Sequence, residues 1–176
     1  MFTKNGIKKL LSDINPKKAC GPDNVSARIL HECAEILLIL LFTASLKQST
    51  IPDEWRHALV IPLYKGGKKD RSKAENYRPI SLTSVTCKLM EHIIHSHIMN
   101  HFENDKTLSD TQHDFRKFQS CETQLILTMN TLAKSLNNRQ QTDFVLLDFS
   151  KAFDKVCHRK LLLKLHHYGI RGNMLT

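Results

Sequence analysis

Residues 144–165 read FVLLDFSKAFDKVCHRKLLLKL, and this stretch decides how the rest of the chain is interpreted. Its apolar beginning predicts a buried strand over 143–149 that carries Asp148 near its end. The residues from 158 to 168 have the pattern of a helix, which Gly169 would stop. A carboxylate at the exit of a buried strand is held rigidly and still meets solvent, which suits a metal ligand in phosphoryl transfer.

Two interpretations of this stretch remain open. In the first, Asp148 and a second carboxylate work with Mg²⁺ ions, which would lower the pKa of an attacking hydroxyl and steady a leaving pyrophosphate. In the second, Asp148 only ends a strand and Asp154 caps the helix after it. Spacing alone favours the second interpretation.

Upstream, residues 57–64 predict a short strand and residues 80–83 a second one, joined by a polar loop with Gly66 and Gly67 at its tip. Basic side chains outnumber acidic ones in and beside this loop. They are Lys65, Lys68, Lys69, Arg71, Lys73 and Arg78, against Asp70 and Glu75. A mobile basic loop could cover a triphosphate or grip a template backbone. The alternative is a solvated loop whose charges only keep it soluble.

Three helices are expected around this hairpin. The first would be capped by Asp23 or Asn24 and run to about Lys47, and the others would cover 85–103 and 121–137. The segment Gln112–Lys117 lies between the last two, and its Phe-Arg pair could stack on a base and contact phosphate. Helices and short strands alternate without a regular βαβ order, which indicates an α+β fold or part of a mixed fold.

Composition narrows the class of protein. The 176 residues carry a net charge of +9 and are 41% hydrophobic, which suits one globular domain, or a large piece of one, with a polyanionic partner. The five cysteines are scattered without a CxxC pair, which is typical of reduced thiols. The start lacks a signal-peptide core, and the longest apolar run, 36–42, is too short to span a membrane. We therefore expect a soluble protein of the cytoplasm or nucleus.

Together these segments resemble the reverse transcriptases of non-LTR (LINE-like) retrotransposons, and they occur in the same order. The similarity covers nearly the whole chain from about residue 15. NYRPISL is quite specific on its own, and the combination is more specific still. The matching segments are CGPDNVSARIL (20–30), IPDEWRHALVIPLYKGGKKD (51–70), NYRPISL (76–82), LSDTQHDFRKFQS (108–120), the opening stretch itself and YGIRG (168–172).

The resemblance implies an α+β fold, namely the fingers and partial palm of a right-hand polymerase. The basic N-terminal segment would be 1–22, the fingers-like region 23–142, and the start of the palm 143–176. The chain would then be a fragment of an RNA-directed DNA polymerase. Its parent enzyme would use Mg²⁺, an RNA template, a DNA primer and deoxynucleoside triphosphates.

The resemblance also implies roles for single residues. Asp148 matches the first metal-binding, catalytic aspartate, and the carbonyl of Phe149 would lie beside the metals. Phe153 matches the bulky residue under the incoming sugar. The remaining matches are contacts with the nucleotide or the nucleic acid. They are Lys65 and Arg78 for the triphosphate, with Lys68 and Lys69 as alternatives, and Gln112 and Arg116 near template and nucleotide. The charge of the basic loop, rather than the resemblance, adds Arg71 and Lys73 as candidate contacts with nucleic acid.

The chain departs from the family pattern in two ways. Asn24, Asp114 and Phe118 stand where the family has glycine, and Gln119 stands where it has arginine. The sequence also contains no Tyr/Phe-Ala-Asp-Asp segment, which would supply the second pair of catalytic carboxylates. We therefore expect no polymerisation by this chain alone. The alternatives are a non-catalytic remnant that binds RNA or an RNA–DNA hybrid, and an inert, poorly folded product of a degraded element.

Overall fold

The computed structural model of the chain describes residues 4–33, 35–172 and 175. Helices and one small antiparallel sheet make up the described part, so the α+β class is confirmed at that level. The elements are α1 (Lys4–Ser12), α2 (Ala27–Cys33), α3 (Glu35–Gln48), the short 3₁₀ helix η1 (Asp53–Arg56), β1 (Leu59–Tyr64), the 3₁₀ helix η2 (Ala74–Asn76), β2 (Tyr77–Leu82), α4 (Val85–Asn104), α5 (Cys121–Asn137) and α6 (His158–His167).

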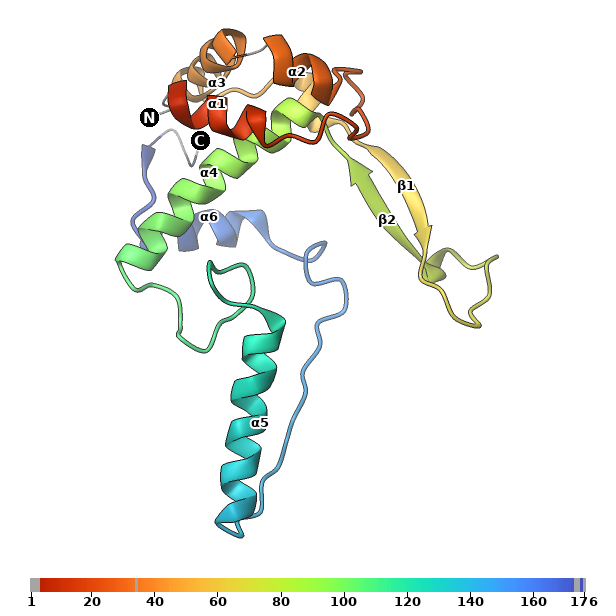
Figure 1. Cartoon of the computed structure of the whole chain (residues 1–176), viewed down its shortest axis with the longest axis vertical. Coiled ribbons are helices and arrows are strands. Elements are labelled where there is room, and N and C mark those ends of the chain that lie inside the picture. The colour runs from red at the N-terminus through yellow and green to blue at the C-terminus, as the bar shows by residue number, and fades with distance from the viewer. Residues whose placement is uncertain (1–3, 34, 173–174, 176) are drawn as a thin grey trace. The chain divides into compact units, whose positions relative to one another are not determined.

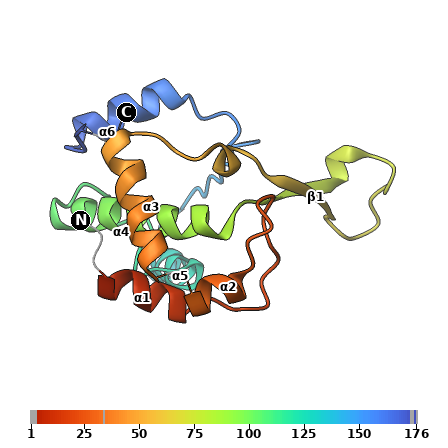
Figure 2. The same ribbon diagram turned by 90° about the horizontal axis from the view of Figure 1, so that it is seen from above.

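The described residues form two compact units. The first contains the chain up to Ser96 with Arg171 and Gly172, and the second contains His97–Ile170 with Leu175. In the first unit, α1, α2 and α3 gather around the beginning of α4 (Figures 1 and 2). Their shared core centres on Phe42, which is fully buried and meets the Trp55 ring edge-on at 6.0 Å.

A chain of buried hydrogen bonds joins distant segments in this unit. The Trp55 indole donates to the Thr86 hydroxyl at 3.0 Å, Thr86 lies 2.6 Å from the Ser84 hydroxyl, and Ser84 donates to the Asp23 carboxylate at 2.5 Å. A Cβ on Gly21 would lie only 2.6 Å from the backbone of Ser84. Only glycine allows this close approach, so Gly21 and Asp23 together fix the 20–24 turn against the start of α4.

The predicted helix from residue 24 to 47 is wrong in its start. The helices α2 and α3 cover most of the predicted range, and residue 34 between them lies outside the described residues. The cap is Ser26, whose hydroxyl accepts the Ile29 N–H at 3.2 Å, rather than Asp23 or Asn24. The Asp23 carboxylate instead accepts hydrogen bonds from the Ser84 hydroxyl and the Val25 N–H. Asn24 has a φ of +54°. The chain therefore becomes helical only after Ser26.

The predicted hairpin is confirmed, with a second strand that begins at Tyr77 rather than Ile80. Its antiparallel register pairs Leu59 with Leu82, Pro62 with Pro79 and Tyr64 with Tyr77. The Lys65 N–H donates to the Asn76 carbonyl at 2.9 Å, so alternation makes the proline pair a non-hydrogen-bonded one. Two prolines can therefore face each other in this sheet without removing a ladder hydrogen bond.

The three remaining helical predictions are confirmed almost to the residue. α5 begins with a capping box, in which Ser120 and Thr123 each bond the other's backbone N–H. α6 ends where Gly169, at φ +91°, donates to His166 and Ile170 donates to Leu165, the two bonds of a Schellman motif. No helix in the described part of the chain is long and apolar enough to cross a membrane.

The predicted buried strand over 143–149 is wrong. These residues have no regular structure, and the side chains of Leu146 and Leu147 are 80% and 83% exposed. A strand forms only when another strand satisfies its backbone groups, and no described segment pairs with this one. The apolar positions of α5, including Leu125 and Met129, are also exposed, so the second unit buries little apolar surface.

Candidate nucleic-acid interface and catalytic segment

Residues 65–76, the hairpin tip, connect β1 to β2 and include the 3₁₀ helix η2 (Figure 1). Tyr64 and Tyr77 form the last strand pair, with ring centroids 5.5 Å apart. The Tyr64 hydroxyl donates to the Lys69 carbonyl, and the Tyr77 hydroxyl donates to the Arg71 carbonyl at 2.9 Å. Sequence analysis missed both tyrosines, although their placement on either side of a polar loop was a usable signal.

Some basic residues of the hairpin bind groups within it, and among the described residues the others are exposed without a bound acceptor. Lys65 Nζ donates to the Glu75 carbonyl at 2.6 Å, and the Arg71 guanidinium lies over the Tyr64 ring at 5.0 Å. The pKa of Asp70 is lowered because the Ser72 N–H and hydroxyl donate to its carboxylate. The other cations are exposed and, within the described residues, show no bound acceptor. They are Lys68, Lys69 and Lys73 in the hairpin tip and Arg78 on β2.

The Arg116 side chain lies within the second unit, where it binds Glu103 near the end of α4 and the loop backbone at Ser109. We call this contact the clamp. The Arg116 guanidinium donates to both carboxylate oxygens of Glu103, at 2.9 and 2.7 Å, and to the Ser109 carbonyl at 2.8 Å. The side chain is 11% exposed. These bonds lower the pKa of Glu103 and raise that of Arg116. The bidentate pair fixes the loop 105–120 to the end of α4, and Glu103 is a partner that sequence reasoning did not find.

His113 is a second residue that the sequence did not single out. It is 6% exposed, and its Nδ1 lies 2.7 Å from the Thr123 hydroxyl oxygen. The same oxygen also accepts from the Ser120 N–H. Nε2 of His113 is buried without a partner among the described residues. His113 ties the loop to the first turn of α5.

The other residues of this loop are turned outward. Gln112 is exposed, and its amide contacts only the Asp114 carbonyl, at 3.4 Å, among the bonds of the described residues. Phe115 and Phe118 have φ values of +60° and +63°, whereas Asp114 is not among the residues with positive φ. Phe118 stands where the family has glycine, and it adopts the left-handed backbone that glycine tolerates best. Its ring is 90% exposed.

The candidate catalytic segment contains Asp148, Phe149 and Phe153, and all three are exposed. The Phe153 ring meets Phe115 edge-on, with centroids 6.4 Å apart, so the segment contacts the Phe-Arg loop within the second unit. α6 begins at His158 after Cys157, so Asp154 does not cap this helix and that alternative interpretation is wrong. Lys65 and Arg78 belong to the first unit.

The donor set around Asp148 does not by itself fit a magnesium site. Mg²⁺ needs six oxygen ligands in near-octahedral order, usually from more than one carboxylate with water and substrate. Asp148 and the Phe149 carbonyl supply two. Over residues 4–33, 35–172 and 175, no group of three or more His, Cys, Asp or Glu side chains is placed to hold a metal ion.

Comparison with known proteins shows the family to which this chain belongs. The family described as reverse transcriptase (RNA-dependent DNA polymerase) matches residues 67–175, which is more than half of the chain. The matched region contains part of the hairpin tip, the clamped loop and the catalytic segment. The chain therefore belongs to the reverse transcriptase family, as the resemblance predicted.

Individual relatives come from mobile elements of flies. The chain is 30% identical to a probable RNA-directed DNA polymerase from transposon BS of Drosophila melanogaster, over 96% of this chain and 20% of the relative. It is 31% identical to the RNA-directed DNA polymerase from mobile element jockey of Drosophila funebris, over 92% and 18%. The chain thus spans about a fifth of the length of these relatives and represents part of a reverse transcriptase domain.

Proposed function

We propose that this chain provides the fingers-like region, 23–142, and the start of the palm, from 143, of a non-LTR retrotransposon RNA-directed DNA polymerase. Its contribution would be to hold nucleic acid and the triphosphate of an incoming nucleotide. The hairpin tip carries this proposal, because it presents Lys68, Lys69 and Lys73 as exposed cations on a loop that the Tyr64 and Tyr77 hydroxyls bond. Exposed lysines bind phosphates and release counterions from nucleic acid.

Binding of an RNA–DNA hybrid tests this part of the proposal. Replacing Lys68 and Lys69 by glutamate should weaken binding at least tenfold at low salt and reduce the slope of log K against log salt, because fewer counterions are released. The matched control replaces Lys8 and Lys9, two exposed lysines on α1, with the same change in net charge. Equal losses in both variants, or binding that does not depend on salt, would contradict a specific role for the hairpin tip.

Catalysis belongs in this proposal to a longer polypeptide. Asp148 would be its first metal-binding aspartate, and Mg²⁺ would activate the primer hydroxyl there when bound. Phe149, Phe153, Gln112 and Arg78 would contact the metals, the sugar, the template and the triphosphate, as the family resemblance implies. Arg116 acts in this proposal through Glu103, by holding the loop that carries Gln112.

Primer extension on an RNA template tests the catalytic part. We expect no incorporation above background by this chain with Mg²⁺ or Mn²⁺, because no group of three or more His, Cys, Asp or Glu side chains among the described residues is placed to hold a metal ion. Synthesis that disappears in Asp148→Asn would show that the chain polymerises by itself and would contradict this expectation. A failure of the hybrid to bind would instead contradict the role of the hairpin tip.

A non-catalytic remnant that binds RNA or a hybrid is the second candidate function. The irregular, exposed backbone at Asp148 favours it, since a catalytic carboxylate must be held rigidly. Both candidates place the chain in the cytoplasm or nucleus, where its thiols stay reduced and RNA is available. Binding that survives Asp148→Asn unchanged, with no synthesis in any longer polypeptide, would select this candidate.

A further inference from the structure

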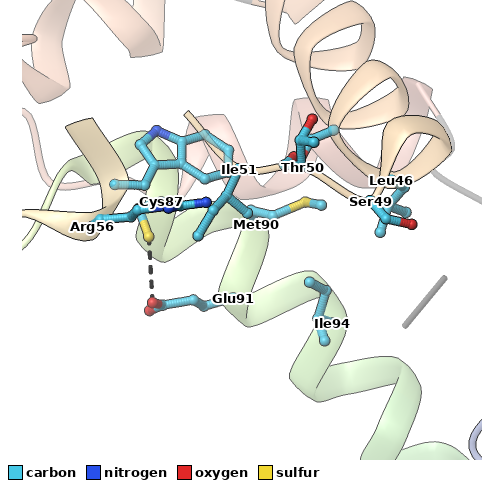
Figure 3. Close-up of a pocket in the computed structure, with 11 residues that line it drawn as sticks. Leu46, Ser49, Thr50, Ile51, Arg56, Cys87, Met90, Glu91 and Ile94 are labelled. Atoms are coloured by element: carbon cyan, nitrogen blue, oxygen red, sulfur yellow. Dashed lines mark hydrogen bonds between the residues drawn. The ribbon is translucent and has the colours of Figure 1, made fainter. Parts of the chain in front are cut away.

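Residues 143–149 expose apolar side chains and peptide groups together. Each of the five apolar side chains in this segment is at least 58% exposed. By contrast, Met90 and Ile94, which line a pocket of about 440 Å³ in the first unit, are buried and half-buried (Figure 3). No backbone hydrogen bond of residues 143–149 occurs within the described part of the chain. The segment therefore has the properties of an exposed edge strand, which is a template for pairing with another strand.

The order of side chains in this segment is self-complementary. In an extended strand, successive side chains point to opposite faces. One face would carry apolar residues at its centre, an acidic residue at one end and a basic residue at the other. These residues are Asp143, Val145, Leu147, Phe149 and Lys151. When a second copy of the row runs in the opposite direction, each charged end meets the opposite charge.

We propose that two copies of this chain dimerise by antiparallel pairing of this segment through Lys151, with the two Leu147 residues directly opposite each other. Each Asp143 then faces Lys151 of the other copy, and each Val145 faces Phe149, a favourable pair of a β-branched and an aromatic residue. Parallel pairing in register would instead place every aspartate opposite its own copy, which is destabilising. The charges thus select both the direction and the register of the second copy.

The other face and the backbone are compatible with this register. Phe144 and Leu146 would lie opposite Ser150 and Asp148, so no like charges meet on that face. Lys151 has a φ of +54° in the unpaired chain and would become extended on pairing. Because a left-handed conformation is strained for lysine, this change would release strain.

Sedimentation equilibrium of the whole chain, freed of nucleic acid, measures this dimer. Two strands without a third are only marginally stable, so we expect a Kd of about 30 µM. Asp143→Lys and Lys151→Asp should each raise this Kd about tenfold, because each turns two attractive pairs into repulsive ones. The variant with both substitutions restores opposite charges in both pairs, and its Kd should lie within about twofold of the wild-type value.

The net charge of the variants gives the control. Asp143→Lys makes the chain more basic and Lys151→Asp makes it less basic, so general repulsion between copies would move the two Kd values in opposite directions. Lys160→Asp, at an exposed position of α6, matches the charge change of Lys151→Asp. It should not raise the Kd, because residue 160 lies outside the paired segment.

Disulfide trapping tests the register. Cys121 and Cys157 are exposed, so both are first replaced by serine. Leu147→Cys should then give a covalent dimer on mild oxidation, because the two copies of this position lie opposite each other. Leu146→Cys would face Asp148 and should give little covalent dimer.

Three outcomes would overturn the proposal. The first is a wild-type chain that unfolds cooperatively yet stays monomeric at about ten times the expected Kd. The second is a dimer whose Kd is the same in the wild type and both single charge variants. The third is equal trapping at positions 146 and 147, which would show contact without a fixed register.

Discussion

At the residue scale, the three positions where glycine is usual in the family differ in backbone conformation. Asn24 has a φ of +54°, which asparagine tolerates better than most residues. Asp114 is not among the residues with positive φ. Phe118 is strained, because a bulky side chain at φ +63° brings its Cβ too close to the following carbonyl oxygen.

Replacing Phe118 by glycine should therefore stabilise the chain. The relief of left-handed strain is about 1–2 kcal/mol, reduced by about 0.5–1 kcal/mol for the greater freedom of glycine in the unfolded chain. We expect a net gain of about 0.5–1 kcal/mol in the free energy of unfolding, measured by urea denaturation. Phe118→Ala is the control, since it removes the exposed ring and keeps the strain. If alanine stabilises as much as glycine, the backbone at 118 is not left-handed in solution.

At the scale of elements, the contact between the loop 105–120 and α4 should depend on pH. Arg116 lowers the pKa of Glu103, so the ionised carboxylate is favoured in the folded state. The stability that this contributes is present above the ordinary pKa of 4.5 and is lost as pH falls below it. We expect the urea midpoint of the wild type to fall between pH 5 and pH 3 more steeply than that of Glu103→Gln.

Arg116→Gln gives a reciprocal check on this contact. It leaves Glu103 without its partner, so its pH dependence between pH 5 and pH 3 should be as shallow as that of Glu103→Gln. Asp70 and Glu122 also have lowered pKa values and are present in every variant, so they cancel from the comparison. Identical slopes in the wild type and both variants would show that the clamp does not form in solution.

Sequence features within a few residues of each other predicted the helices and the hairpin. The features that the sequence did not predict depend on contacts between distant residues. Ser120, Gly169 and the apolar spacing of 85–103 act within a few residues, so α5, α6 and α4 could be placed from the sequence. The cap of α2 could not, because Asp23 bonds Ser84, sixty-one positions away. The same holds for Arg116, whose partner Glu103 lies in another element. The strand over 143–149 was predicted from its composition, but a strand exists only with a pairing partner.

At the scale of the whole molecule, apolar burial is uneven between the two units. The core cluster consists of residues such as Phe42, Trp55 and Met90, all in the first unit, whereas the second unit leaves Leu146 and Phe149 exposed. Stability follows buried apolar area, so the first unit should unfold cooperatively and the second should open at lower denaturant concentration. This difference separates a partly folded protein from the wholly inert product considered above, which would have no cooperative unit.

Alkylation of the cysteines measures this difference directly. Cys121 and Cys157 are exposed in the second unit, while Cys87 is buried in the first. Burial, and then the bond to Glu91, raise the pKa of Cys87 from 9.0 to about 12, so at pH 8 its thiolate should be about 1,000-fold scarcer than that of an ordinary thiol. With N-ethylmaleimide and peptide mass spectrometry, we expect Cys121 and Cys157 to react at once and Cys87 only across a sharp urea transition. If Cys87 reacts as fast as they do in buffer, the first unit has no formed core, and the inert product becomes the better description of this chain.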